Sequence, residues 1–210
     1  MTEFVKDKYK ENEKIIKLAT FFVLMTLMLG LFIYFGTKDF EADIEPVPDN
    51  IHFNNDYPKI DKNNVFVYKK INEIQNILKS GNGLVFFCTA KSEWCHSYAE
   101  ILNDTAKEAG IKEIAYYDIY TDRMKNNQNY KDLMTILGAY LIRDDENNKK
   151  LYLPALFSVK NGSIINYNYD TALGIGNATA INYWTIDKII DTKEKLYIIY
   201  NNLNGNESGY

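Results

Sequence analysis

The chain of 210 residues has little of what most metal, phosphate and nucleic-acid sites require. Its 2 histidines, His52 and His96, stand far apart, so no histidine-based metal cluster is indicated. It has no Gly-rich phosphate loop, no Gly-x-Ser-x-Gly motif and no plausible Ser-His-Asp set. Lys and Arg total 24 against 28 Asp and Glu, and a net charge of −4 argues against nucleic acid as a partner. We therefore expect no metal, no cofactor and no nucleic acid.

Charge is also missing locally, from one long stretch. Residues 18–37 contain no charged side chain, and 20 residues at about 1.5 Å rise per residue span the hydrocarbon core of a bilayer. A buried core helix is the alternative, but such helices are rarely free of charge for so long. A cleaved signal peptide has an apolar core of about 7–15 residues and a small-x-small exit, and neither is present here. The pattern favours an uncleaved transmembrane helix.

Lysines flank this stretch unequally. Only Lys38 occurs within twenty residues after it, whereas five precede it: Lys6, Lys8, Lys10, Lys14 and Lys17. Positive charge stays on the cytoplasmic side. We therefore expect residues 1–17 to form a cytoplasmic tail and the bulk of the chain to lie outside a cell membrane that it crosses once.

The rest of the chain divides into a linker and a domain. Residues 38–62 are acidic, contain three of the four prolines and lack a helical period, which predicts a solvated tether. Overall, 46% apolar and 25% charged residues suit a globular protein. We expect one folded domain over residues 63–205.

Hydrophobic periodicity predicts an alternating order of elements in this domain. The predicted strands are 65–68, 84–88, 114–120, 151–159 and 163–169, and the predicted helices are 70–81, 94–109, 129–141 and 191–203. The order β-α-β-α-β-α-β-β-α indicates an α/β fold, a mixed central sheet with helices on both faces. Residues 171–190 do not fit this order and are interpreted as an insertion.

Three short motifs carry a resemblance. Glu93-Trp94-Cys95 follows a buried strand and opens a long helix, Tyr117-Asp118-Ile119 lies in the next strand, and Leu153-Pro154-Ala155 comes shortly before Lys160-Asn161-Gly162. In this order they resemble the thioredoxin-like family across residues 63–205. With the anchor and tether, the chain also looks like the membrane-anchored thioredoxin-like proteins of low-GC bacteria, including the bacteriocin-transport accessory group.

The resemblance implies a set of site residues. Cys95 would be the nucleophile at a helix N-terminus, where free N–H groups stabilise a thiolate, and protonated His96 would add to this. Trp94 would shield the thiol side of the site. Pro154 would be a cis-proline facing Cys95, and the Leu153 backbone would be free to pair with an extended peptide.

The sequence departs from the family in its second thiol. Cys-x-x-Cys is replaced by Cys95-His96-Ser97-Tyr98, and the strand over 84–88 is apolar where the family often has a buried Asp. Dithiol exchange is therefore expected to be lost. Two interpretations stay open: a monothiol disulfide exchange through Cys95, or a relic cysteine on the surface of a non-catalytic binding module.

Cys88 is the only other cysteine. It ends a strand predicted to be buried, and free cysteine is among the most buried residue types, so we expect a packed core thiol. A disulfide with Cys95 is the alternative, but a strand end and a helix start separated by six residues need not approach within about 7 Å.

The partners expected follow from these two interpretations. The chain would contact the lipid bilayer and either protein or peptide thiols or, as an accessory subunit, a membrane exporter. Enzymatic activity depends on whether Cys95 is reactive.

Overall fold

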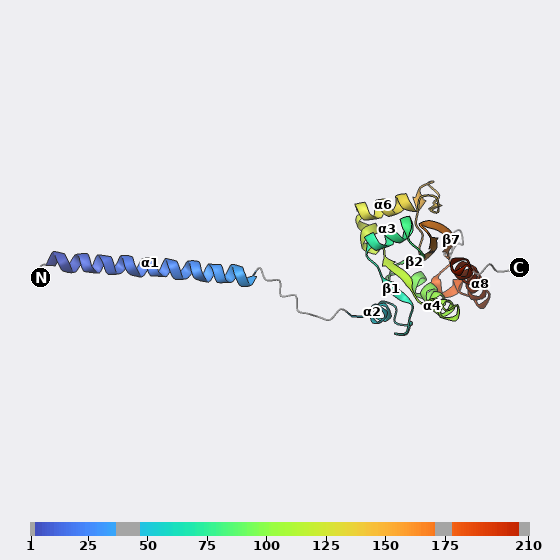
Figure 1. Ribbon diagram of the computed structural model, residues 1–210, viewed down its shortest axis with the longest axis horizontal. Coiled ribbons are helices and arrows are strands. Elements are labelled where there is room, and N and C mark those ends of the chain that lie inside the picture. Colours follow the sequence, from blue (N-terminus) through green and yellow to red (C-terminus); the bar gives the residue numbers. More distant parts are fainter. Residues whose placement is uncertain (1–2, 37–46, 171–177, 206–210) are drawn as a thin grey trace. The chain divides into compact units, whose positions relative to one another are not determined.

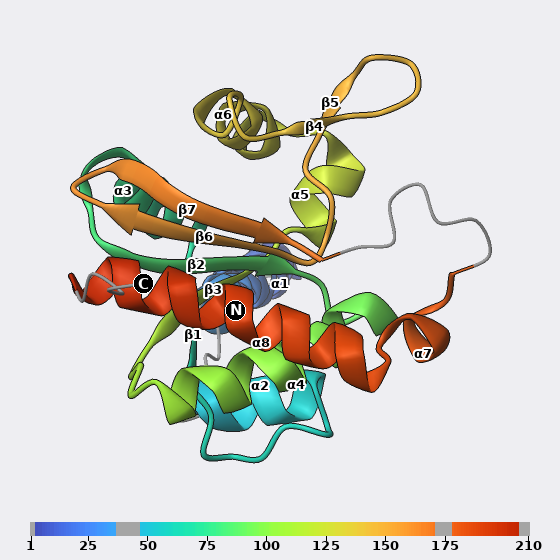
Figure 2. The same ribbon diagram turned by 90° about the vertical axis from the view of Figure 1, so that its right-hand side faces the viewer.

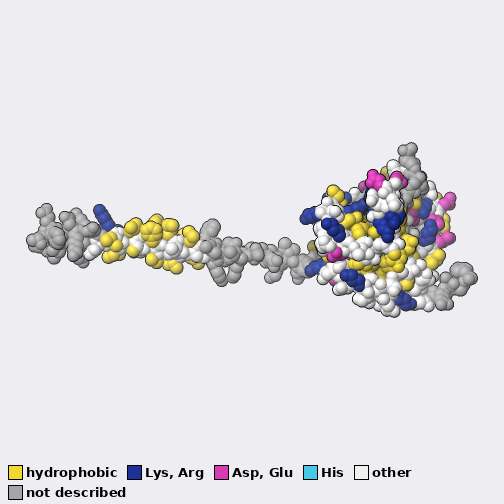
Figure 3. Space-filling model, turned by 90° about the horizontal axis from the view of Figure 1, so that it is seen from above, with side chains coloured by type: hydrophobic (Ala, Val, Ile, Leu, Met, Phe, Trp, Pro, Cys, Tyr) yellow, Lys and Arg dark blue, Asp and Glu magenta, His cyan; other side chains and the backbone are white. Residues whose placement is uncertain are grey.

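A computed structural model describes residues 3–36, 47–170 and 178–205, in two compact units (Figure 1). The first unit contains α1, Glu3–Gly36. Within it, Asn12–Leu31 is long and apolar enough to cross a membrane, and its visible face carries mainly hydrophobic side chains (Figure 3). The predicted apolar helix near the N-terminus is confirmed. Thr37 and residues 38–46 lie outside the described residues.

The second unit begins at Val47 and is built on a five-stranded sheet in the order β1-β3-β2-β6-β7. The strands are β1 Phe66–Tyr68, β2 Gly83–Cys88, β3 Ile114–Asp118, β6 Ala155–Lys160 and β7 Ser163–Tyr169. β1, β3 and β2 are mutually parallel. β6 runs antiparallel to β2, and β7 runs antiparallel to β6, so β7 has the same direction as β1, β3 and β2. This confirms the predicted mixed α/β sheet, an arrangement consistent with a thioredoxin-like fold.

Two helices cover one face of the sheet, α3 Ile71–Ser80 and α6 Gln128–Ile136 (Figure 2). The buried side chains between them and the strands are mostly aliphatic: Ile74, Leu78, Val85, Ala115, Leu133, Leu137 and Val159, with Phe87 and Phe157. The helix predicted over 129–141 ends at Ile136, and α5, Tyr120–Lys125, precedes it.

Three helices cover the opposite face, α2 Asp49–Asp56, α4 Glu93–Glu108 and α8 Ile186–Asn204 (Figure 2). This core is rich in aromatic rings, namely Phe53, Tyr57, Phe66, Phe86, Tyr98, Tyr116 and Tyr200. α8 begins earlier than the predicted 191–203 because the Thr185 hydroxyl accepts the Lys188 N–H at its start.

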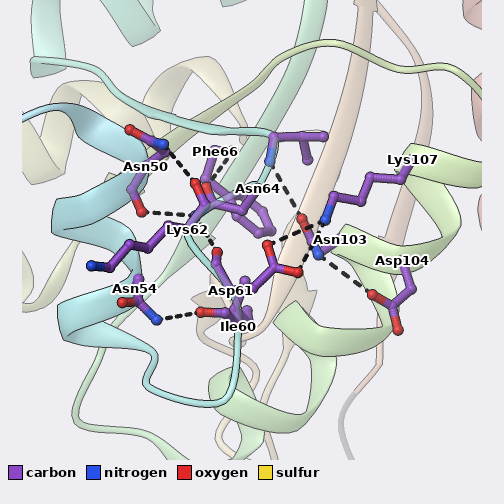
Figure 4. Close-up of polar contacts among 11 residues, drawn as sticks. Asn50, Asn54, Ile60, Asp61, Lys62, Asn64, Phe66, Asn103, Asp104 and Lys107 are labelled. Atoms are coloured by element: carbon purple, nitrogen blue, oxygen red, sulfur yellow. Dashed lines mark hydrogen bonds and ion pairs between the residues drawn. The ribbon is translucent and has the colours of Figure 1, made fainter.

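The prediction of a solvated tether through residue 62 is wrong from Val47 onward. Phe53 of α2 is buried in the core, as are Tyr57 and Ile60 in the turns that follow this helix. The segment is also fastened to the residues just before β1, because the Asn64 amide donates to the Asn50 carbonyl over 2.8 Å (Figure 4). Prolines and acidic residues surround these few apolar side chains, so no apolar period is visible here in the sequence.

Two further regions differ from the prediction. A small hairpin, β4 Ile142–Arg143 and β5 Lys149–Lys150, stands in the crossover between α6 and β6. Of the predicted insertion over 171–190, residues 171–177 lie outside the described residues. The remainder forms α7, Ala180–Tyr183, and the first turn of α8.

Candidate functional site

The two cysteines form a disulfide between the end of β2 and the first turn of α4. The Cα atoms of Cys88 and Cys95 are 5.8 Å apart, and both residues are fully buried. The expectation that Cys88 is a free packed thiol is therefore wrong. The connecting loop is a tight turn in which the Ser92 N–H donates to the Thr89 carbonyl over 3.1 Å, and this turn keeps strand end and helix start together.

Several contacts hold this loop, residues 89–92, against the domain. The Ala90 N–H donates to Asp118 Oδ2 over 3.4 Å, and His96 Nε2–H donates to the Ala90 carbonyl over 2.8 Å. The Lys91 ammonium lies 3.7 Å from the centre of the Tyr120 ring, a cation–π contact. The loop is thus fixed from β3, α4 and α5.

One loop contact reaches the disulfide itself. The Thr89 N–H donates to Cys95 Sγ over 3.3 Å. Cys95 also occupies the third position of a 16-residue helix, where backbone N–H groups have no intrahelical partner. If the disulfide opened, this environment would stabilise a Cys95 thiolate.

The predicted cis-proline is present. The Leu153–Pro154 peptide bond is cis, and Pro154 is buried just before β6. Phe87 of β2 pairs with Ala155 of β6, so Cys88 and Pro154 are the next residues along neighbouring strands. Leu153 packs against both core clusters. The fold therefore brings Cys88 and the cis-proline to the same end of two neighbouring strands, and the disulfide joins Cys95 to Cys88 there.

Tyr98 has a structural place in the domain. The residue is fully buried, and its hydroxyl donates to Asn168 Oδ1 over 2.9 Å, which ties α4 to β7. Burial raises the pKa of Tyr98 well above its ordinary value, so the hydroxyl stays protonated as a donor. The side chain three positions after Cys95 is therefore a core contact.

Trp94 turns toward α7. Its ring centre lies 5.1 Å from that of Tyr183, and the residue is partly buried. Next to it, Trp184 packs 6.1 Å from Tyr98. Tyr183 and Trp184, from the predicted insertion over 171–190, are thus aromatic neighbours of the site.

Tyr57 is a site neighbour that sequence reasoning missed. Its ring centre lies 4.8 Å from that of His96, and its hydroxyl shares a 2.9 Å hydrogen bond with the hydroxyl of Tyr116. Burial raises the pKa of both tyrosines, so the pair stays uncharged. Of the buried side chains Phe53, Tyr57 and Ile60, only Phe53 lies within α2, so no helical period in the sequence indicated this contact.

Asp118 is an acidic residue that accepts a hydrogen bond from the loop. It pairs in register with Cys88 across β2 and β3, and its carboxylate accepts the Tyr120 N–H over 2.8 Å as well as the Ala90 N–H. Its role in this structure is to orient the backbone around the disulfide. Among the described residues, no group of three or more His, Cys, Asp or Glu side chains could hold a metal ion.

Comparisons of the chain with protein-family models, curated proteins and solved structures gave no match. The chemistry of the site is therefore argued from its own geometry.

Proposed function

We propose that the chain is a membrane-anchored, extracytoplasmic thioredoxin-like protein that exchanges disulfides through Cys95. The observation that carries this proposal is the Cys88–Cys95 disulfide at the start of α4, beside the strand that follows the cis-proline. Disulfides persist in oxidising compartments, which agrees with a domain outside the membrane. The apolar stretch of α1 and the five lysines before residue 18 support an N-terminus in the cytoplasm.

The exchange chemistry follows from the surroundings of Cys95. A thiolate is the attacking species, and its formation is favoured by the N-terminus of α4 and by the Thr89 N–H. His96 donates to a backbone carbonyl, so it positions the loop. Trp94, Leu153 and Pro154 would line the approach of an extended client peptide, since the resemblance assigns substrate contacts to these positions.

In the test, the Cys88–Cys95 disulfide of the full, folded chain is reduced in detergent. The reduced chain then reacts with a peptide that contains one internal disulfide. Acid quenching should trap a mixed disulfide on Cys95, and Cys95→Ser should abolish it. The Ser97→Ala variant, altered two positions away on the same helix, should leave the adduct unchanged. Absence of both an adduct and reduction of the peptide disulfide by the folded, reduced chain would overturn the exchange function.

A binding module is the second candidate, and one observation favours it. Neither cysteine is exposed to solvent while the disulfide is closed. In that case the disulfide would only stabilise the domain, and a protein partner such as a membrane exporter would dock without thiol chemistry. Alkylation of the reduced, folded chain separates the two candidates, because a purely structural pair would react only on unfolding.

The proposed topology has its own test. Protease added to intact spheroplasts should digest the domain and spare an N-terminal tag. A protected domain would contradict the extracytoplasmic location.

A further inference from the structure

We infer that Cys88 is the second thiol of the exchange site, in the role that Tyr98 leaves open; this rests on the proposed exchange through Cys95. In this arrangement the partner cysteine comes from upstream, on the end of β2, rather than from the next turn of α4. The site is then a pair separated by seven positions, with the loop 89–92 inside it.

Two observations assign this role to Cys88. Its Cα lies 5.8 Å from that of Cys95, within the usual range of a disulfide, so the bond can form without movement of either element. The alternative position is closed, because Tyr98 is fully buried and holds Asn168. A site that works with one thiol needs no second cysteine within bonding distance. In this structure Cys88 is within that distance and is bonded to Cys95.

The location of Cys88 also fits the substrate side of the site. By the β2–β6 register, Cys88 neighbours Pro154 across the sheet, and Leu153 immediately precedes that proline. A client strand paired with Leu153 would therefore bring its sulfur to the cysteine pair.

The exchange balances without a further oxidant or reductant. The Cys95 thiolate attacks one sulfur of a client protein disulfide, which breaks the client bond, forms a mixed disulfide and expels the other client sulfur as a thiolate. The Cys88 thiol then loses its proton to solvent and attacks Cys95 Sγ. The Cys88–Cys95 bond forms and the second client thiolate leaves. Two electrons pass to the client disulfide, and the protein dithiol becomes the observed disulfide.

The loop 89–92 controls access to this pair. In the closed state it holds a tight turn that is fastened by Asp118, His96 and Tyr120. The Thr89 N–H at its start contacts Cys95 Sγ. Opening the disulfide removes the cross-link between the residues on either side of the loop, so that apart from its backbone the loop is held by hydrogen bonds and one cation–π contact. Access for a client sulfur is therefore expected to follow reduction.

The experiment compares the reduced full chain in detergent with its Cys88→Ser and Cys95→Ser variants. Each reacts with the same single-disulfide peptide and is quenched with acid over time. In wild type we expect the amount of mixed disulfide to rise and then fall. In Cys88→Ser it should accumulate to at least tenfold more, and Cys95→Ser should form none. Thermal melting of each variant checks that it is folded.

A second measurement keeps the inference testable if Cys88→Ser does not fold. In wild type, peptide mapping by mass spectrometry should show the Cys88–Cys95 disulfide returning at the rate at which the mixed disulfide decays. Equal accumulation in wild type and Cys88→Ser, or decay without return of this disulfide, would overturn the role of Cys88 and leave the exchange function standing. An adduct on Cys88 in Cys95→Ser would reverse the assigned roles and also overturn the inference. No adduct in any folded chain would overturn the exchange function itself.

Discussion

The two faces of the sheet are packed in different ways. Between the sheet and α3 and α6, the core is mainly aliphatic. Between the sheet and α2, α4 and α8, it contains buried tyrosines whose hydroxyls are paired, such as Tyr57 with Tyr116 and Tyr98 with Asn168. The disulfide and the loop 89–92 lie with the second face.

The two kinds of packing have different effects on stability and on geometry. Aliphatic packing has no preferred direction, so substitutions that conserve volume are tolerated. Paired hydroxyls fix the separation and angle of the elements they join, because a buried hydroxyl without its partner is costly. We infer that the aliphatic face stabilises the domain, whereas the tyrosine face sets the geometry around the cysteines.

The largest expected effect is from removing the N-terminal part of the tyrosine face. A fragment that starts at Asn63 loses Phe53, Tyr57 and Ile60, each a fully or nearly fully buried side chain. At about 2 kcal/mol or more per side chain, the loss is on the order of the whole stability of a domain. A fragment from Val47 should melt cooperatively and one from Asn63 should not. Equal cooperative melts would place α2 outside the fold.

The next effect concerns the disulfide. Replacing Cys88 and Cys95 by serine together should lower the free energy of unfolding by about 2–3 kcal/mol, the value expected for closing a loop of this length. Urea titration of the Val47 fragment measures it, and wild type titrated with a reductant serves as the comparison. A change below about 0.5 kcal/mol would mean that the disulfide does not stabilise the domain.

A matched pair of substitutions compares the two faces directly. Tyr116→Phe removes one partner of the hydroxyl pair and leaves Tyr57 unpaired, which should cost about 1–3 kcal/mol. Leu133→Met conserves volume on the aliphatic face and should cost less than about 1.5 kcal/mol. Urea titration should rank them in this order. The reverse ranking would refute the distinction drawn between the faces.

The smallest expected effect is at the surface of the loop. Lys91→Ala removes the cation–π contact with Tyr120 and should lower stability by no more than about 1 kcal/mol. It should nevertheless speed hydrogen exchange of the amides in the loop 89–92, because one of its ties is gone. Lys131→Ala, at an exposed site on α6, should change neither quantity.

Most regular elements and the sheet could be predicted from the sequence, since each has a clear period. Ile74 and Leu78 mark a helical stripe, and the unbroken run 84–88 marks a buried strand. α2 could not be recognised in the same way, because its apolar side chains are few and stand among prolines and acids. These side chains are buried against β1 and β3, and that contact exists only in the folded chain.

The site was predictable in part for the same reason. Trp94, Cys95 and Pro154 belong to local motifs, and the cis bond at Pro154 is present as expected. The bond from Cys95 to Cys88 depends on the turn between them, and seven positions of sequence separation do not determine how a loop folds. The approach of Tyr57 to His96 depends on the packing of α2, which was itself missed.

The position of α2 has a mechanical consequence. It is the first described element after the residues that follow α1, so tension applied to the chain from a membrane would reach α2 before it reached the sheet. The bonds that resist it include those from Asn64 to Asn50 and from Asn54 to Ile60 (Figure 4). Because Tyr57 follows α2 and rests on His96, peeling this helix away would also remove a support of the loop over the cysteines. Tension applied at the N-terminal side of the domain would therefore act on α2 and on this support of the loop before it acted on the sheet.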